Sequence, residues 1–431
     1  MKLYPHQQEA LRLTSGLRRV AYYYDMGLGK TFIGSEKMRE IGNRINLIVC
    51  QKSKVEDWCE HLYNCYNDIA IMNLTEKRTY EAFMLNYNLT NRIIVAVINY
   101  ELIWRDSRKG LMSLSGFTLM LDESSLIQNR TAKKTRFIMK MNPDAVILLS
   151  GTPTSGKYEN LWTQCHLLGW DITNHAFQTT YVNWTTIDVG GFPQKIVDKR
   201  DPYKNVDRLK RKMREHGCIF CKTEDVMDLP DQQFITLKCH APVQYRKFME
   251  DSVVTIKHHG ESIQLIGDTI LSKRLRARQL CGMYCKSKIA SFHDLVQSTN
   301  ARLIVFYSFR TERDELIKAC EDRPISLVDG DTKDLKAYEE EDNSVTLIQY
   351  QAGAMGLNLQ KAHIIVYFTP PERSDLFEQS KKRIHRIGQS VTCIYYMLTA
   401  ANTIEQDIYR ALSKREDYTN DLFTAYETKN Y

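Results

Sequence analysis

The sequence predicts an α/β fold with two lobes, each a parallel sheet flanked by helices, and with a helical middle segment between them. Short apolar runs rich in β-branched residues alternate with segments of helical periodicity, which is typical of βα units around a parallel sheet. The runs form two sets, and residues 155–300 between the sets have mostly helical or irregular patterns. The length of 431 residues also exceeds that of one ordinary domain.

The strands of the first lobe are expected at residues 20–24, 46–50, 93–98, 117–121 and 145–149. Those of the second lobe are expected at residues 302–307, 325–328, 345–350, 363–368 and 392–397. A proline breaks the pattern at Leu229-Pro230-Asp231, just before another apolar run, and we place the crossing between the lobes there. The first lobe then comprises residues 1–228, and the second lobe with the helical insertion comprises residues 229–431.

The composition is that of a soluble globular protein, with 43% apolar and 26% charged residues. We expect no membrane span, because no run of about 18 apolar residues occurs. The first residues lack the apolar core of a signal peptide, and the 11 cysteines are scattered beside apolar residues. Both features predict a cytoplasmic protein. The net charge of +7 permits a polyanionic partner without identifying one.

The most informative motif is a glycine-rich turn between a predicted strand and a segment of helical periodicity. It consists of Asp25, Met26, Gly27, Leu28, Gly29, Lys30 and Thr31. The two glycines let backbone N–H groups close around phosphate oxygens. Lys30 can then reach the β- and γ-phosphates, and the Thr31 hydroxyl can hold Mg²⁺. Tyr24 stands where the strict motif has its first glycine, so a simple turn between strand and helix stays as the alternative.

Two adjacent carboxylates, Asp122 and Glu123, follow the predicted strand at residues 117–121. Side chains at the carboxyl end of a parallel strand face the crevice where ligands bind. Asp122 can complete the Mg²⁺ sphere, and Glu123 can orient and deprotonate the water that attacks the γ-phosphate. An exposed turn is the alternative. The phosphate-binding turn, which lies about 90 residues upstream, favours the functional interpretation.

The second lobe contains a basic segment, residues 379–389, in which Arg383 and Arg386 are three positions apart. On a helix they would share a face, and a guanidinium suits the spread charge of a phosphoryl-transfer transition state. A basic helix that covers the lobe surface is the alternative. Residues 350–359 are rich in small side chains, so the backbone there can approach a phosphate or a sugar, or can form a simple turn.

The pairs Cys218/Cys221 and Cys281/Cys285 have spacings that invite a zinc interpretation. Neither pair has the flanking glycines and aromatic residues of a zinc knuckle. A zinc-stabilised scaffold is therefore the weakest of the alternatives.

In order along the chain, these blocks resemble the motifs of helicase superfamily two and, within it, of the Swi/Snf-type ATPases. The usual motif I of that family also lacks the first glycine. The likeness covers nearly the whole chain, and the last basic block, with Gly388-Gln389, is highly specific. The blocks are Leu3–Gln7, Asp25–Thr31, Leu47–Trp58, Asn99–Glu101, Asp122–Glu123, Ser150–Pro153, Arg302–Phe309, Leu327–Gly330, Gln351–Leu359, Gln379–Gln389 and Thr403–Glu405.

The resemblance implies two RecA-like lobes with ATP between them, so that hydrolysis requires the lobes to close. It implies a DNA-dependent ATPase that uses ATP and Mg²⁺, tracks duplex DNA as a monomer, and remodels DNA or protein–DNA complexes. With its short middle insertion, the chain resembles a minimal prokaryotic or phage form, which would act in the cytoplasm of the cell or infected host.

The resemblance also implies a role for individual residues. Catalytic roles fall on Lys30, Asp122, Glu123, Arg383 and Arg386, and Mg²⁺ binding falls on Thr31 and Asp122. Nucleotide binding falls on Gln7, Asp25, Met26, Gly27, Leu28, Gly29, Lys30, Thr31 and Gly356. Contacts with the DNA backbone fall on Lys52, Ser53, Lys54, Tyr100, Ser308 and Gln351, and such contacts position the protein without reading sequence.

The sequence departs from the family at three places. Ser124-Ser125 replaces the usual Gly-His after the acidic pair, so we expect hydrolysis to be coupled differently to the nucleic-acid groove. Glu372-Arg373-Ser374 stands where many members have Trp-Asn-Pro, and Cys221 stands where an arginine is common. Two further alternatives stay open: a helicase that unwinds or anneals strands at forks, and an ATP-gated DNA clamp without catalysis.

Overall fold

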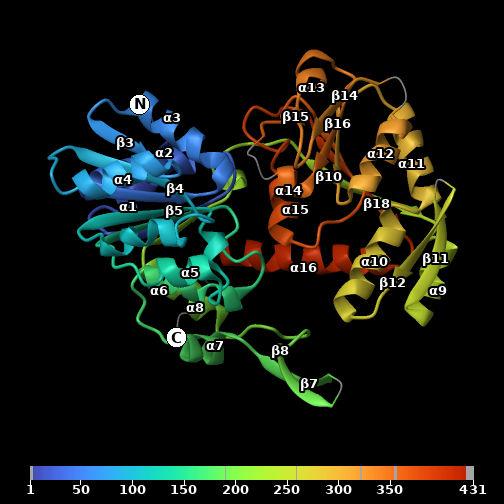
Figure 1. Ribbon diagram of the computed structural model, residues 1–431, viewed down its shortest axis with the longest axis horizontal. Helices are drawn as coiled ribbons and strands as arrows, with labels where there is room; N and C mark the ends of the chain where they lie inside the picture. The colour runs from blue at the N-terminus through green and yellow to red at the C-terminus, as the bar shows by residue number, and fades with distance from the viewer. Residues whose placement is uncertain (1–2, 190, 259, 321–322, 354–356, 424–431) are drawn as a thin grey trace. The chain divides into compact units, whose positions relative to one another are not determined.

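The computed structural model describes residues 3–189, 191–258, 260–320, 323–353 and 357–423. The chain divides into two compact units, one of residues 1–226 and 417–431 and the other of residues 227–416. Each unit contains one seven-stranded sheet (Figure 1). The sheets are parallel apart from one antiparallel pair at an edge of the second, so the predicted α/β fold of two RecA-like lobes is confirmed.

The sheet of the first unit has the strand order β3-β4-β2-β5-β6-β1-β9, and all of its adjacent strands are parallel. Its two faces belong to separate apolar clusters, with Tyr23 of β1 in one and Tyr22 in the other. A strand buried on both faces has a continuous apolar sequence, which is why these runs could be recognised. The strands are β1 (Arg19–Tyr24), β2 (Ile45–Cys50), β3 (Ile69–Asn73), β4 (Ile93–Asn99), β5 (Phe117–Asp122), β6 (Ala145–Ser150) and β9 (Cys218–Cys221).

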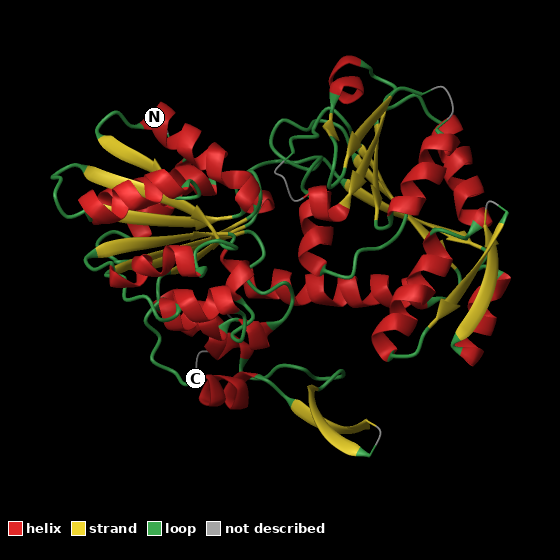
Figure 2. Ribbon diagram, viewed as in Figure 1, coloured by secondary structure: helices red, strands yellow, loops and turns green. Residues whose placement is uncertain are grey.

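Helices cover both faces of this sheet (Figure 2). The α-helices are α1 (Pro5–Leu13), α2 (Lys30–Ile41), α3 (Val55–Cys65), α4 (Lys77–Asn86), α5 (Lys133–Ile138), α6 (Trp162–Leu167), α7 (Asn174–Tyr181) and α8 (Val206–Glu215). Short 3₁₀ turns follow several strands: η1 (Lys52–Lys54), η2 (Asp106–Ser113), η3 (Ser124–Ile127), η4 (Tyr158–Asn160) and η5 (Thr223–Asp225).

The sheet of the second unit has the order β10-β18-β17-β13-β16-β14-β15. Its strands are β10 (Gln232–Cys239), β13 (Leu303–Tyr307), β14 (Ile325–Val328), β15 (Lys333–Asp334), β16 (Val345–Gln349), β17 (Ile364–Tyr367) and β18 (Cys393–Ala400). Its helices are α9 (Val243–Asp251), α10 (Ile270–Gly282), α11 (Lys286–Gln297), α12 (Arg310–Ala319), α13 (Lys336–Glu340), α14 (Tyr350–Gly353) and α15 (Ser374–Lys381), and α16 (Ile404–Phe423) begins in this unit.

All of the strands predicted from the sequence are present, but residues 155–300 also contain strands where helical or irregular structure was predicted. Besides its helices, this segment contains the hairpin β7 (Trp184–Val189) and β8 (Phe192–Val197), the hairpin β11 (Val253–His258) and β12 (Glu261–Ile266), and the edge strands β9 and β10. Strand β10 mixes apolar with polar residues and is only partly buried, and it is a strand because its whole length pairs with β18. A pattern search for buried strands misses such elements, since their residues are not apolar on both faces.

Candidate active site

The glycine-rich turn joins strand β1 to helix α2 in the first unit. Gly29 has a φ of +75°, and a Cβ atom there would lie 2.2 Å from Nε2 of Gln7. Gln7 is buried and donates from that Nε2 atom to the carbonyl oxygen of Leu28 at 3.0 Å. Its Oε1 atom accepts a hydrogen bond from the backbone N–H of Tyr4 at 3.0 Å. Helix α1 therefore braces the turn, and glycine is required at position 29 both for its φ and for this close approach.

The Lys30 side chain folds back over the same turn. Its Nζ atom donates to the carbonyl oxygens of Tyr24 at 2.9 Å and of Asp25 at 3.2 Å. The Asp25 carboxylate accepts hydrogen bonds from the backbone N–H and the hydroxyl of Thr223, at 3.1 and 3.3 Å. The hydroxyl of Thr31 has no hydrogen-bond partner among the described residues. The turn thus has a rigid frame with an ammonium group and a free hydroxyl at the start of α2.

Asp122 and Glu123 lie at the same edge of the sheet as this turn. The order β5-β6-β1 with parallel pairing brings the carboxyl ends of β5 and β1 to one side, a single strand apart. Burial raises the pKa of Asp122, while a hydrogen bond from Trp58 Nε1 (2.8 Å) and the charges of Lys30 and Lys54 oppose the rise. The carboxylate of Asp122 therefore lies within the electrostatic reach of the Lys30 ammonium.

Glu123 has an unusual backbone conformation for a residue with a side chain. Its φ and ψ are 53° and 57°, which is the left-handed region. Its Oε2 atom accepts a hydrogen bond from Ser150 Oγ at 3.3 Å, across the neighbouring strand end. Strain of this kind costs of order 1–3 kcal/mol and concentrates at functional sites. The conformation turns the chain sharply out of β5 directly after Asp122.

Gln164 of helix α6 connects three segments that lie far apart in the sequence. It is fully buried, and its Oε1 atom accepts hydrogen bonds from Ser124 Oγ at 2.8 Å and from the Tyr23 hydroxyl at 3.0 Å. Its Nε2 atom donates to the carbonyl oxygen of Pro153 at 2.8 Å. Ser124, which departs from the family pattern, is therefore part of a polar network rather than an exposed turn. No local sequence signal identified Gln164, because its partners lie far away along the chain.

The residues predicted to contact DNA in the first unit fall into two groups. Lys52 and Ser53 are exposed in η1, and Lys54 beside them forms an ion pair with Asp57 at 2.6 Å. Tyr100 is fully buried, and its hydroxyl donates to the carbonyl oxygen of Asp122 at 2.9 Å. The prediction that Tyr100 contacts the DNA backbone is therefore wrong for this structure: the side chain supports the acidic strand end from inside the core.

In the second unit, Arg383 and Arg386 do not share a helix face, so that expectation is wrong. Helix α15 ends at Lys381, and Arg383 and Arg386 lie in the turns that follow, where the carbonyl oxygen of Arg383 accepts the N–H of Leu359 at 3.2 Å. Arg383 is buried, and its Nη1 atom donates to the carbonyl oxygen of Leu357 at 3.3 Å. Arg386 is half-buried, and burial lowers its pKa. Its guanidinium has no hydrogen bond or ion pair among the described residues.

The other second-unit predictions have mixed outcomes. The backbone N–H of Ser308 donates to Glu312 Oε2 at 2.8 Å, and its hydroxyl accepts from Arg278 at 3.3 Å. Ser308 is thus partly committed within its own unit. Gln351 is exposed in α14. Gly356 lies outside the described residues.

The two cysteines of β9 project to opposite faces of the sheet. Cys218 packs into one apolar cluster of the first unit and Cys221 into the other. In a strand, residues three apart point to opposite sides, so these two thiols do not converge on one point.

Among the described residues, no helix combines the length and the apolar character that a bilayer crossing requires.

Two family profiles match the chain. The SNF2-related domain matches residues 15–284, and the helicase conserved C-terminal domain matches residues 287–388. The chain belongs to the SNF2-related family. The first match contains the glycine-rich turn, the acidic pair and the Gln164 network, and the second contains Arg383 and Arg386. The predicted kinship with Swi/Snf-type proteins of helicase superfamily two is thereby confirmed.

Curated relatives agree with this membership. An uncharacterized ATP-dependent helicase of Mycoplasma genitalium is 21% identical over 91% of this chain and 39% of its own length. The SWI/SNF-related matrix-associated actin-dependent regulator of chromatin subfamily A-like protein 1 of Drosophila melanogaster is 22% identical over 96% of this chain and 55% of its own length. The chain thus spans about two fifths to one half of the relatives it matches.

A solved structure described as the Sulfolobus solfataricus SWI2/SNF2 ATPase core in complex with dsDNA is 20% identical to this SNF2-related chain. The alignment covers 98% of this chain and 93% of that chain, with a TM-score of 0.43.

Proposed function

We propose that this SNF2-related chain is a DNA-dependent ATPase that hydrolyses ATP in order to move along duplex DNA and to remodel DNA or protein–DNA complexes. The observation that carries the proposal is the common sheet edge of the glycine-rich turn and the acidic pair, where the charge of Lys30 acts on Asp122. A turn that can close around phosphates, next to a carboxylate pair, is what phosphoryl transfer to water requires.

In this scheme the backbone of residues 25–29 and the ammonium of Lys30 hold the phosphates of ATP. In the structure, Lys30 Nζ donates to the carbonyl oxygens of Tyr24 and Asp25. When ATP binds, phosphate oxygens take the place of these two acceptors. The Thr31 hydroxyl and the Asp122 carboxylate fit Mg²⁺, since both are oxygen donors at this edge and no described residue engages the Thr31 hydroxyl. When bound, Mg²⁺ neutralises charge on the β- and γ-phosphates.

Glu123 is the proposed general base. Its carboxylate takes a proton from the attacking water, and Ser150 Oγ helps to hold it in position. The left-handed backbone of Glu123 directs its side chain differently from that of Asp122, so that one carboxylate serves the metal and the other serves the water. The Ser124–Gln164 bond holds the residue that follows Glu123, and we propose that it keeps the base in its orientation.

We assign residues 1–228 to an ATP-binding lobe and residues 229–431 to a C-terminal lobe. Arg386, and Arg383 with it, is proposed to approach the transferring phosphoryl group when the two lobes close on ATP. Because no described residue pairs with the Arg386 guanidinium, it is available for a transition-state charge without first breaking an ion pair. Closure and opening in each cycle would shift the lobes along a bound duplex.

For DNA, we propose that Lys52 and Ser53 contact backbone phosphates, together with Lys54, Ser308 and Gln351. Lys52 and Ser53 are exposed, and contacts of this type position a protein on DNA without reading its sequence. Such binding is expected to weaken steeply as the salt concentration rises, because each neutralised phosphate releases counterions.

The experiment that tests the proposal is a phosphate-release assay with and without duplex DNA. Wild-type protein is expected to hydrolyse ATP faster with duplex DNA, and Glu123→Gln to lose turnover while it still binds ATP and DNA. Glu81→Gln is the matched control, because Glu81 is an exposed carboxylate on α4 whose ion pair is with Lys77 at 3.7 Å. Unchanged turnover in Glu123→Gln would remove Glu123 from the mechanism, and no hydrolysis in the wild type would refute the motor.

A further inference from the structure

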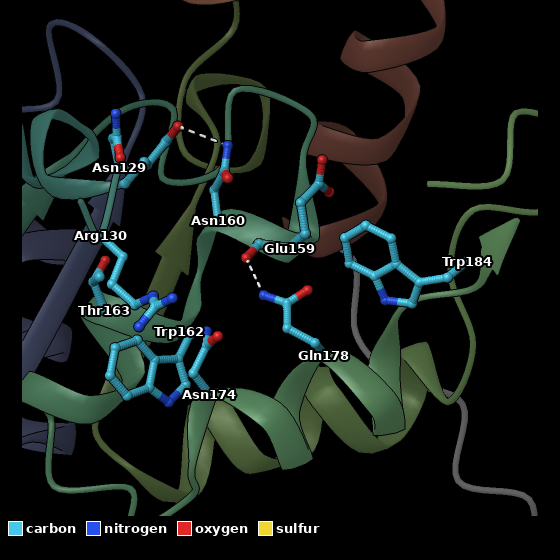
Figure 3. A pocket seen from close by; sticks show the side chains of 10 residues that line it. Asn129, Arg130, Glu159, Asn160, Trp162, Thr163, Asn174, Gln178 and Trp184 are labelled. Atoms are coloured by element: carbon cyan, nitrogen blue, oxygen red, sulfur yellow. Dashed lines mark hydrogen bonds between the residues drawn. The ribbon is translucent and has the colours of Figure 1, made fainter. Parts of the chain in front are cut away.

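A pocket of about 470 Å³ opens in the first unit among residues that carry none of the roles proposed above (Figure 3). Its walls come from the segment after η3, from η4 and helix α6, from helix α7, and from the first residue of the β7–β8 hairpin. A volume of this size lies within the range of pockets that hold small organic ligands. Carboxamide and indole side chains dominate the lining.

The carboxamides of the pocket have hydrogen-bonding capacity to spare. Gln178 donates from Nε2 to the carbonyl oxygen of Glu159 at 2.8 Å, while its Oε1 atom is buried and has no partner among the described residues (Figure 3). Asn160 donates from Nδ2 to Gln128 at 3.4 Å, which leaves its own oxygen as an acceptor. Within the described part of the chain, Asn174 has no side-chain hydrogen bond. A buried acceptor without a donor is costly, so a turn of the Gln178 carboxamide that brings Oε1 to a ligand N–H group in the pocket would be favoured.

Two tryptophans supply flat apolar surface on opposite sides of the pocket, Trp162 from α6 and Trp184 from β7 (Figure 3). The side chain of Trp184 is 40% exposed, and contacts of the neighbouring residues hold its backbone in place. Val182, two residues earlier, bridges to Tyr203, and the Tyr203 hydroxyl donates to Glu159 Oε2 at 2.7 Å. The base of the hairpin is therefore tied to the pocket wall, and it holds the Trp184 ring beside the carboxamides.

The segment that forms one side of the pocket is strongly basic. Residues 124–143 contain no aspartate or glutamate, and their basic residues are Arg130, Lys133, Lys134, Arg136 and Lys140. Arg130 lines the pocket, is exposed, and has no ion pair among the described residues. An anionic group at this side of the pocket would therefore be stabilised.

We propose that this pocket binds a nucleobase between its indoles and carboxamides, with the attached phosphate against Arg130. Carboxamide side chains match the paired donors and acceptors on the edge of a base, and aromatic side chains stack on its face. The base can come from an unpaired nucleotide of a DNA strand or from a free mononucleotide, which share this chemistry. The inference goes beyond the proposed motor, whose DNA contacts are made to the backbone.

The test is a binding titration without ATP or Mg²⁺, so that it does not depend on hydrolysis. The probes are a duplex with a single bulged 2-aminopurine, the same duplex fully paired, and 2-aminopurine riboside 5′-monophosphate. Stacking on an aromatic side chain quenches 2-aminopurine. We expect the bulged duplex to bind more tightly than the paired one, and Trp184→Ala to weaken binding of the bulged duplex by about tenfold.

Two further variants keep the test decisive. Gln178→Met preserves the size of the side chain and removes the unpaired acceptor, and it is expected to weaken binding about as much as Trp184→Ala. Phe192→Ala is the matched control, because Phe192 is an aromatic residue of the same hairpin that is 77% exposed and does not line the pocket. Equal binding of bulged DNA by wild type, Trp184→Ala and Gln178→Met would overturn the proposal.

The probes also separate the two sources. Loss of bulged-DNA binding in both variants, with negligible binding of the free monophosphate, identifies an unpaired DNA nucleotide as the ligand. Binding of the free monophosphate that both variants abolish, without a preference for the bulge, identifies a free nucleotide. The titration is repeated with Lys30→Ala, because Lys30 belongs to the proposed ATP site and does not line this pocket. Binding that is unchanged in this variant is binding to the pocket, whether or not the proposed motor function holds.

Discussion

Replacing Gln164 with leucine is expected to destabilise the first unit, because Gln164 is fully buried and satisfies groups from three other segments. The hydroxyls of Tyr23 and Ser124, also buried, would lose the acceptor that they share. The carbonyl oxygen of Pro153 would keep the Gln128 side chain as a donor at 2.9 Å. Two orphaned hydroxyls cost roughly 2–6 kcal/mol, at roughly 1–3 kcal/mol each. The buried leucine recovers part of this, so we expect a net loss of about 2–4 kcal/mol.

Thermal unfolding followed by tryptophan fluorescence measures this loss. All 5 tryptophans of the chain lie in the first unit, at positions 58, 104, 162, 170 and 184, so their emission reports on that unit. For a unit of this size, a loss of about 2–4 kcal/mol lowers Tm by about 4–16 °C. The exposed Gln194 of β8 gives the matched control, and Gln194→Leu is expected to change stability by less than about 0.5 kcal/mol.

A triple variant isolates the cause of the loss. The triple variant adds Tyr23→Phe and Ser124→Ala to Gln164→Leu, and so removes the two hydroxyls that would be left unpaired. We expect it to recover more than half of the decrease in Tm that Gln164→Leu causes. Replacing both partners of a buried hydrogen bond by apolar groups of similar shape is nearly neutral, whereas removing one partner is not. If the triple variant is no more stable than Gln164→Leu, the hydrogen bonds are not the reason for the loss.

Three further predictions concern other parts of the chain. Arg386→Ala is expected to leave ATP affinity near that of the wild type while hydrolysis falls by about 10³-fold or more. Binding and turnover assays measure the two effects separately. A large drop in affinity at normal kcat would contradict this role. Lys52→Ala is expected to reduce the slope of log affinity for duplex DNA against log salt by about 1, whereas Tyr100→Phe leaves the slope unchanged because Tyr100 is buried. Glu405→Gln leaves the fully buried Lys288, which pairs with Glu405 at 2.6 Å, as an uncompensated charge. Unfolding followed by circular dichroism should show that the free energy of unfolding falls by about 3–5 kcal/mol. The double variant Lys288→Met with Glu405→Leu should restore it.

The sequence alone was sufficient for the strands that are buried on both faces and for the order of the motifs along them. The run at residues 117–121 became β5, and the glycine-rich turn joined β1 to α2 as predicted. Such features depend on local patterns: a strand covered by helices on both sides must be apolar throughout, and a close backbone approach, as at Gly29, excludes a Cβ atom. The motifs and their order along the chain were also sufficient to predict its family.

The tertiary structure decided which side chains meet. It placed Tyr100 under the acidic pair instead of on the surface, ended the helix before Arg383, and joined Ser124 and Tyr23 to Gln164 across 40 and 141 positions of sequence. It also formed the pocket beside Trp184 from segments that have no shared motif. The physical reason is that a local pattern reports whether a residue is buried, whereas its hydrogen-bond partner is selected by strand order and helix packing, which bring distant segments together.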